Sequence, residues 1–257
     1  MKEVLTVFRA VLVRQLTLYR RYLFNTLSGL VTMYIVFMLL MTGARAIGGT
    51  TFMNGDAPLQ SLVVGYLVWV FAMVGYQELA WGITNEAQMG TLEKLYLTPI
   101  GFSWVQGLLQ LSLLIMQLGL TGTLLMFIML TTGVRLQVDL VSVLPIILVT
   151  ILAAYGLGFL MAGLGLVYKR VQSAFQILQF SLIGFLAAPS SWGRFLPLNL
   201  GNRMLASVMV DGNRLWQLPA ADWAALVFVN VTYLALGFVA FRFFEGKARE
   251  LGLLGHY

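Results

Sequence analysis

The sequence predicts an all-α integral membrane protein with six transmembrane helices, an N-terminal amphipathic interfacial helix and a re-entrant helical hairpin before the last span. Hydrophobic residues make up 60% of the 257 residues and charged residues only 10%, whereas a soluble domain carries about 25% charged residues. The apolar residues also fall into six blocks, and about 20 apolar residues in a helix cross the ~30 Å hydrocarbon core. We therefore assign residues 1–22 to the interfacial helix and 23–257 to one transmembrane domain.

The composition excludes several kinds of site. Cysteine is absent and the one histidine is His256, so disulfides and thiolate metal sites are excluded and histidine-based catalysis is not expected. No GxxxxGK[ST] phosphate loop occurs, so the chain does not bind ATP in the usual way by itself. The net charge of +6 is typical of charges that flank membrane spans and does not call for nucleic acid. We expect no catalytic, metal or cofactor site in this chain.

Residues 1–22 predict an amphipathic helix rather than a signal peptide, because arginines interrupt the apolar run and no small-residue cleavage site follows. On a helical wheel the apolar residues fill one half and the charged residues the other, with Val13 and Gln15 as exceptions. Such a helix lies on the membrane with its basic face among anionic headgroups. Docking onto a calmodulin-like partner is the weaker alternative.

The first span is expected at about 23–42 and the second at about 59–83. A polar loop is expected between them, because residues that favour turns cluster there. These residues are Gly48, Gly49, Asn54, Gly55, Asp56 and Pro58.

The third span is expected at about 102–131, a short loop at 134–139 and the fourth span at about 140–168. Ala154, Gly158 and Ala162 recur at four-residue spacing in the fourth span. Small residues at that spacing let helices approach closely. We interpret them as a packing surface rather than a site.

The fifth span is expected from near Ser173 to Pro189, after a tight turn at 169–170. Prolines, serines and a glycine then break the helix, and the helical pattern that follows is too short to span. Residues of about 189–222 therefore predict a re-entrant or interfacial hairpin. The sixth span follows at about 223–244.

The distribution of Lys and Arg predicts the orientation. Eleven of the 16 lie on one side of the predicted spans and five on the other, and the richer side is cytoplasmic. Both ends of the chain and the segment 85–99 are then cytoplasmic, in what we expect to be the plasma membrane of a prokaryote.

The segment 85–99 is the longest run without a hydrophobic block between two spans. Glu86 and Glu93 are seven residues apart and share one face of a helix, and Leu92 and Leu95 lie on another. Thr98–Pro99 ends the segment before the next span. A short amphipathic helix between two spans suits docking onto another protein, although an ordinary solvated loop has a similar composition.

The pattern from Asn85 to Pro99, NE...GTLE.L..TP, resembles the cytoplasmic signature of the permease subunits of type 2 ATP-binding-cassette (ABC) exporters. The order of predicted elements resembles that family along the whole chain. The resemblance implies that this segment is a coupling helix that docks into a separate ATPase subunit. Its contact residues would be Glu86, Gly90, Thr91, Leu92, Glu93 and Leu95.

The resemblance also implies the partners. Two permease subunits, as a homodimer or a near-symmetric heterodimer, would work with two copies of an ATPase chain that binds ATP and Mg. The cargo would be an amphiphile such as a drug-like molecule, a lipid or a lipid-linked glycan, exported from the cytoplasm. The permease would not be an enzyme by itself, and its remaining contacts would be membrane lipids.

Glutamine side chains form two stripes inside the predicted spans. Intramembrane polar groups need partners that lipid does not offer, so these stripes either line a translocation path or form hydrogen bonds between helices. The stripes comprise Gln106, Gln110 and Gln117 in the third span and Gln172, Gln176 and Gln179 in the fifth.

Glu78 is the only acidic residue well inside an apolar block. We expect it to form an ion pair with Arg20 or Arg21, since a carboxylate near the end of a span finds a partner at the interface. The other interpretation is a proton or cation site, which would make the protein an ATP-independent secondary transporter or channel. A membrane scaffold without transport activity is a third candidate.

Overall fold

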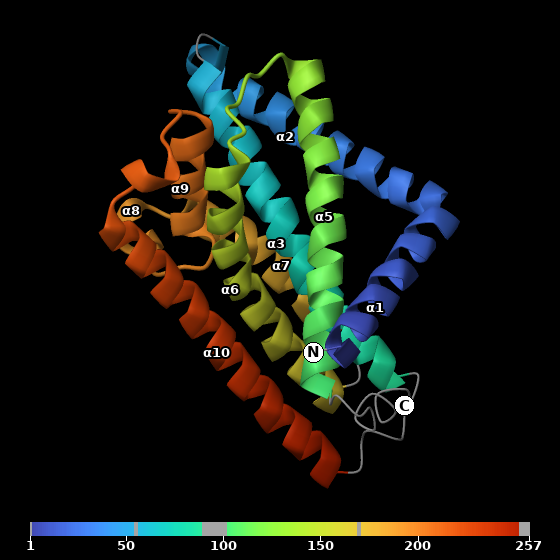
Figure 1. Ribbon diagram of the computed structural model, residues 1–257. Coiled ribbons are helices and arrows are strands. Elements are labelled where there is room, and N and C mark those ends of the chain that lie inside the picture. Colours follow the sequence, from blue (N-terminus) through green and yellow to red (C-terminus); the bar gives the residue numbers. More distant parts are fainter. Residues whose placement is uncertain (1, 54–55, 89–101, 169–170, 252–257) are drawn as a thin grey trace.

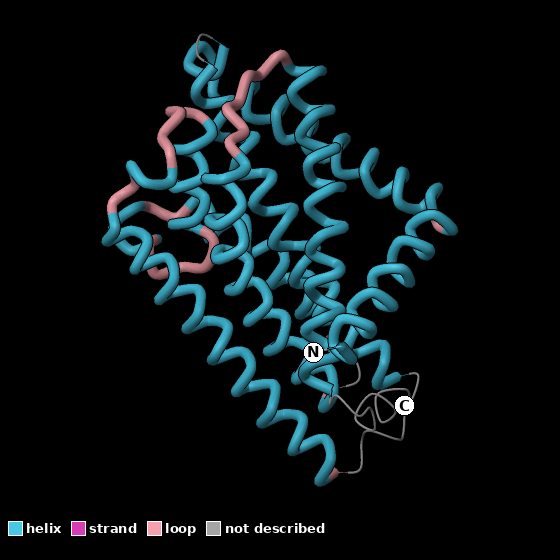
Figure 2. The backbone as a smooth tube through the Cα atoms, viewed as in Figure 1, coloured by secondary structure: helices cyan, strands magenta, loops and turns pink. Residues whose placement is uncertain are grey.

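The computed structural model describes residues 2–53, 56–88, 102–168 and 171–251, and within these ranges it consists of helices joined by loops and turns (Figures 1 and 2). The elements, in chain order, are α1 (Lys2–Arg21), α2 (Leu23–Met53), α3 (Asp56–Gln88), α5 (Phe102–Thr132), α6 (Leu140–Val167), α7 (Gln172–Ala187), α8 (Ser190–Gly193), α9 (Asn199–Met209), η1 (Leu215–Gln217) and α10 (Ala220–Glu250).

Five of these helices are long and apolar enough to cross a membrane, namely α2, α3, α5, α6 and α10. This confirms the all-helical fold class and five of the six expected spans. The expected fifth span forms α7, which has 16 residues and is therefore only about 24 Å long. A helix of that length does not cover the ~30 Å hydrocarbon core by itself.

The polar loop expected between the first two spans is not formed as predicted. α2 continues to Met53, so Gly48 and Gly49 lie inside a helix, and α3 already begins at Asp56. Pro58 falls in the first turn of α3, where a missing backbone N–H costs nothing. The sequence interpretation gave too much weight to glycine, which costs only about 1 kcal/mol in a helix.

α3 is the innermost helix, with α2, α5, α6, α7 and α9 packed around it. Its side chains from Val63 to Met73 are buried apart from Gly65, which has none. By contrast, α2, α5 and α10 expose many large apolar side chains, including Phe24, Phe127 and Phe228. Exposed apolar helix faces of this kind are expected where lipid is the solvent.

α6 packs against both α3 and α10 through small residues. Ala154 and Ala162 are fully buried, and a Cβ built on Gly158 would lie 3.1 Å from the Cβ of Leu79 on α3. The packing surface predicted from the four-residue spacing is therefore confirmed. The helix starts at Asp139, whose carboxylate accepts hydrogen bonds from the Val141 N–H and the Ser142 hydroxyl.

The segment expected as a re-entrant hairpin forms α8, α9 and η1, and α9 packs on α3 and α6. Met204, Leu205, Val208 and Met209 make the buried face of α9, as their spacing predicts. Asn199 joins this segment to α7, because its Nδ2 donates to the carbonyl oxygens of Phe185, Leu186 and Ala188 at 2.9, 3.2 and 3.0 Å.

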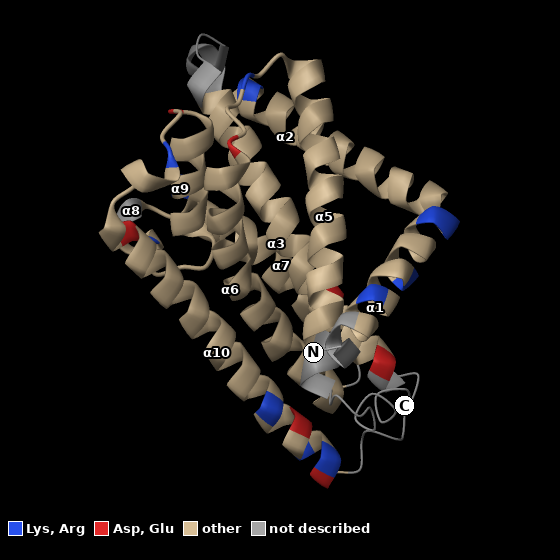
Figure 3. Ribbon diagram, viewed as in Figure 1, with Lys and Arg blue, Asp and Glu red and all other residues tan. Residues whose placement is uncertain are grey.

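Charged residues gather toward the ends of the helices and leave the middle of the bundle largely free of them (Figure 3). The C-terminal ends of α3, α6 and α10 lie at one end of the bundle with the N-terminal end of α5, which we call the Glu86 end (Figure 1). The N-terminal ends of α6 and α10 lie at the opposite end with α8 and α9. The helices α3, α5 and α6 therefore alternate in direction through the bundle.

α1 is the helix predicted over the first 22 residues, and it packs on α5 and α2. α1 and α2 meet at a sharp angle near Tyr22 (Figure 1). Hydrogen bonds from the Tyr22 N–H to the Leu18 carbonyl and from the Thr26 N–H to the Tyr22 carbonyl carry the helical pattern across the bend. The bend directs α1 back along the bundle.

Candidate functional site

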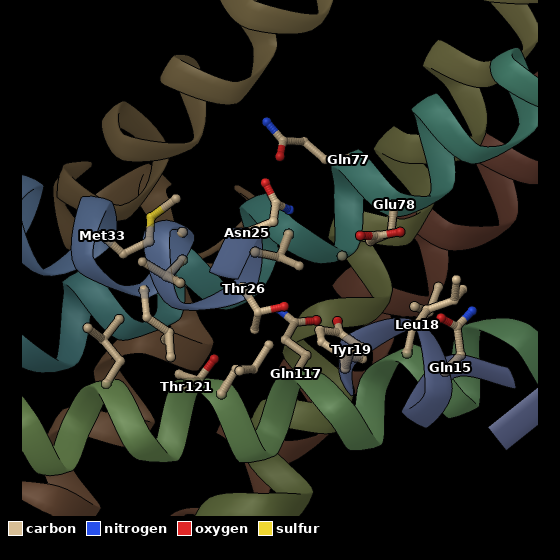
Figure 4. Close-up of a pocket in the computed structure, with 18 of the residues that line it drawn as sticks. Gln15, Leu18, Tyr19, Asn25, Thr26, Met33, Gln77, Glu78, Gln117 and Thr121 are labelled. Atoms are coloured by element: carbon tan, nitrogen blue, oxygen red, sulfur yellow. The ribbon is translucent and has the colours of Figure 1, made fainter. Parts of the chain in front are cut away.

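A cavity of about 680 Å³ lies between α1, α2, α3 and α5, with Tyr155 of α6 in its wall. Cavities of roughly 300–1,000 Å³ hold drug-sized ligands. Figure 4 shows side chains from these helices converging on it, with Gln77 and Glu78 projecting from α3, Asn25 and Thr26 from α2, and Gln117 from α5. The polar lining residues are Gln15, Tyr19, Tyr22, Asn25, Thr26, Gln77, Glu78, Gln110, Gln117, Thr121 and Tyr155.

The bend between α1 and α2 explains why this space is open. Both helices border the cavity, and they diverge from Tyr22, so the space between them and the bundle is not closed by backbone. Gly29 of α2 also lines the cavity, and a Cβ built on it would meet nothing within 4 Å. Side chains of α1 and of the N-terminal half of α2 therefore form one wall of the cavity, while α2 contacts α3 farther along through Met33 and Phe37.

Two of the glutamines that line the cavity have hydrogen-bond partners and a third has none. Gln117 Nε2 donates to the Phe71 carbonyl, and Gln77 Nε2 donates to Gln179 Oε1 of α7 at 2.7 Å. Gln110 is 9% exposed, and neither its Oε1 nor its Nε2 has a hydrogen-bond partner in the described part of the chain. A buried amide without partners costs about 1–3 kcal/mol, so Gln110 is a group that a ligand could satisfy.

Glu78 of α3 is exposed, and it lines the cavity together with Tyr19 of α1. Burial, and in addition the negative charge of Glu78, raises the pKa of the Tyr19 hydroxyl above its usual range. Tyr19 therefore keeps its proton at neutral pH. A neutral hydroxyl in the cavity can donate a hydrogen bond and adds no charge to the lining.

The ion pair expected between Glu78 and Arg20 or Arg21 is not formed. The ion pairs within the described ranges join Arg194 to Asp222 and Glu245 to both Arg242 and Arg249. Arg20 and Arg21 are exposed at the bend, and the Arg21 guanidinium lies 5.9 Å from the centre of the Tyr22 ring. Turning either arginine into the cavity would remove its charge from water, which is costly.

The glutamines of the expected translocation path do not lie together. Gln110 and Gln117 line the cavity, while the side chain of Gln106 lies outside the described residues. Gln179 bonds to Gln77 and thereby joins α7 to the cavity wall. Gln172 and Gln176 are exposed on α7 and do not reach the cavity.

The expected coupling residues are only partly described. Glu86 lies in the last turn of α3. Gly90, Thr91, Leu92, Glu93 and Leu95 lie outside the described residues, between the end of α3 and the start of α5.

Sequence reasoning missed several lining residues, among them Gln15, Tyr19, Gln77 and Tyr155. Gln15 carried a signal, because it is a polar exception on the apolar half of the first helix. Gln77 carried another, because it sits beside Glu78 inside an apolar block. The tyrosines carried none, since tyrosine is common in helices at membrane interfaces.

No group of three or more histidine, aspartate or glutamate side chains that could hold a metal lies together within the described ranges, and we assign no metal site there. Comparison of this chain with protein-family models, with curated proteins and with solved structures finds no match.

Proposed function

We propose that this protein is the membrane-spanning permease subunit of an ATP-driven ABC exporter. A second copy of the chain and two copies of a separate ATPase subunit, which binds ATP and Mg, complete the transporter. The cargo is an amphiphile that enters the cavity between α1, α2, α3 and α5 and leaves on the far side of the membrane. The chain itself has no enzymatic role.

The continuity of α3 carries the proposal. The same helix supplies Gln77 and Glu78 to the cavity wall and Glu86 to the start of the coupling motif, with no break between them. Glu78 and Glu86 are eight residues apart, or about 12 Å along a helix. A push on the motif by an ATPase would therefore move the cavity wall, because a packed helix moves as a rigid unit.

The composition of the motif suits a contact that transmits force. Leu92 and Leu95 supply apolar anchors, and Glu86 and Glu93 supply charges that fix the register. The motif begins at the Glu86 end of the bundle, the same end as the C-terminal part of α10 with Arg242, Lys247 and Arg249. Cationic residues of this kind mark the cytoplasmic side, where a soluble ATPase is available.

Photo-crosslinking in working membranes tests the proposal. A crosslinking amino acid at Leu92 or Leu95 is expected to capture an ATP-hydrolysing protein. The same amino acid at Trp216, which is exposed at the opposite end of the bundle, is the matched control and should not capture it. Transport that proceeds in these membranes without any ATPase crosslinked at either position would overturn the proposal.

A second candidate function follows from Glu78, which faces the cavity without an ion pair among the described residues. A carboxylate in that position could bind a proton or cation in a secondary transporter or channel. That function requires transport to stop when an ionophore collapses the ion gradient, even with ATP present. It also requires Glu93→Ala to leave transport unchanged, whereas an ABC permease would lose it.

A further inference from the structure

The cavity has a polar end and an apolar end. Gln117 of α5 bonds to the Phe71 carbonyl of α3, and the two helices run in opposite directions. Moving seven residues along each helix, toward the Glu86 end, brings Gln110 to the level of Glu78. Tyr19 lines the same cavity as Glu78 and Gln110, so a carboxyl group, an amide and a phenol are available to one ligand.

The other end of the cavity is apolar. Val70 on α3 and Leu124 on α5 line it. Met33 of α2 is at the same level, because its carbonyl accepts a hydrogen bond from Tyr66. Val70 is eight residues from Glu78, which corresponds to about 12 Å along the helix. A ligand that fills the space would therefore be polar at one end and apolar at the other.

The charged side chains that line the cavity determine which sign of ligand charge is favoured. Glu78 is the one acidic side chain among the described lining residues, which include no Lys or Arg. An anionic ligand would meet this carboxyl group with no cation in the described lining to compensate its charge. A bare metal ion would find one carboxylate in a space of about 680 Å³, whereas hard cations require six or more oxygen ligands close together.

We propose that the cavity binds an amphiphilic organic cation, with its positive group beside Glu78 and Gln110 and its apolar part against Val70 and Leu124. Gln110 Oε1 has no partner among the described residues and can accept a hydrogen bond from the cation. The rings of Tyr19 and Tyr155 add faces that attract organic cations. The inference rests on the proposed function, because it names the cargo class of the same cavity.

Binding to the purified protein in discs of neutral phosphatidylcholine tests this inference. Tetraphenylphosphonium and tetraphenylborate have the same four phenyl groups and opposite charges, and empty discs correct for partition into lipid. Tetraphenylphosphonium is expected to bind in excess over empty discs and tetraphenylborate is not. Equal excess binding of the two ions, or none of tetraphenylphosphonium, overturns the inference, and this comparison does not depend on any variant folding.

Variants locate the site. Glu78→Gln keeps the shape of the side chain and is expected to weaken tetraphenylphosphonium binding about tenfold or more, equivalent to about 1.4 kcal/mol. Glu250→Gln removes an exposed carboxylate at the end of α10 and should leave binding unchanged. Glu78→Asp, which retains the charge, should bind better than Glu78→Gln. Unchanged binding in Glu78→Gln overturns the inference.

The outcomes separate this inference from the proposed function. Binding is measured without ATP or an ATPase, so selective cation binding in a protein that no ATPase contacts would support the inference and contradict the exporter. Conversely, ATP-driven export of an anionic or neutral cargo only, with no cation binding, would support the exporter and contradict the inference.

Discussion

Gly156 of α6 and Gly237 of α10 lie backbone to backbone. A Cβ built on Gly237 would overlap the carbonyl oxygen of Gly156, and one on Gly156 would overlap the carbonyl oxygen of Tyr233. Neither overlap can be relieved by a side-chain rotation, because both partners are backbone atoms. The close contact between these two long helices therefore depends on glycine at both positions.

Gly237→Ala is expected to destabilise the protein by about 1–3 kcal/mol or more, because overpacking forces the helices apart. Thermal unfolding in detergent measures the change. Gly246→Ala on the same helix is the matched control, since a Cβ there meets nothing within 4 Å. It should stabilise the helix by roughly 0.5–1 kcal/mol. Equal effects of the two substitutions would contradict the glycine contact.

The hydrogen bond between Gln77 and Gln179 is expected to contribute to the docking of α7. Gln179 also donates from Nε2 to the Met73 sulfur at 2.9 Å, so both ends of its amide are engaged. Gln77→Leu and Gln179→Leu should each destabilise the protein, and a double-mutant cycle should give a coupling of about 0.6–1.7 kcal/mol. Unfolding in a mild denaturant provides the measurement.

Gln176→Leu serves as the control for this cycle. Gln176 is exposed on α7, and exposed substitutions usually change stability by no more than about 0.5 kcal/mol. If Gln176→Leu destabilised the protein as much as Gln179→Leu, the stability of α7 would not depend on the Gln77–Gln179 bond.

The sequence predicted most helices because length and hydropathy set them. The loop at 134–139 and the helix start at Asp139 can be predicted from the sequence, because polar residues and a capping residue are local signals. The hydrogen-bond partners of the polar residues cannot be predicted in this way. A helical wheel shows that Gln172, Gln176 and Gln179 lie near one face, but only the packing of α7 decides that Gln179 alone meets α3.

The same dependence on helix packing explains why the ion pair predicted for Glu78 was wrong. Its expected partners, Arg20 and Arg21, are at the end of a helix whose direction depends on the bend at Tyr22. A sequence pattern gives no direction for such a bend. The bend brings Tyr19, rather than Arg20 or Arg21, to the cavity that Glu78 lines.

Asn199 is expected to hold the end of α7 against the start of α9. Its Nδ2 donates to three carbonyl groups at the C-terminal end of α7, where carbonyl groups lack the full set of intrahelical donors. Asn199→Ala should cost about 1–3 kcal/mol, and Asn199→Asp should cost more because carboxylate oxygens would face those carbonyls. Thermal unfolding measures both variants.

Asn213→Asp is the control for the Asn199 variants, because Asn213 is exposed and its side chain donates to the Ser207 hydroxyl, which can itself donate a hydrogen bond to a carboxylate. It should change the unfolding temperature little. A similar loss in Asn199→Ala and Asn213→Asp would show that the three carbonyl groups find other donors when Asn199 is removed.

If the chain is the proposed permease, Glu93→Ala is expected to disconnect it from its ATPase without disturbing the cavity. Glu93 lies in the coupling motif and far along the chain from the lining residues on α3, so tetraphenylphosphonium binding should be unchanged. Recovery of the ATPase with the purified permease should fall about tenfold or more, which corresponds to the loss of about 1.4 kcal/mol of binding. Glu250→Gln, which removes a carboxylate elsewhere on the predicted cytoplasmic side, is the matched control and should not change the recovery. Transport by Glu93→Ala that continues at the normal rate and stops only when an ionophore collapses the ion gradient would instead favour a secondary transporter that uses Glu78.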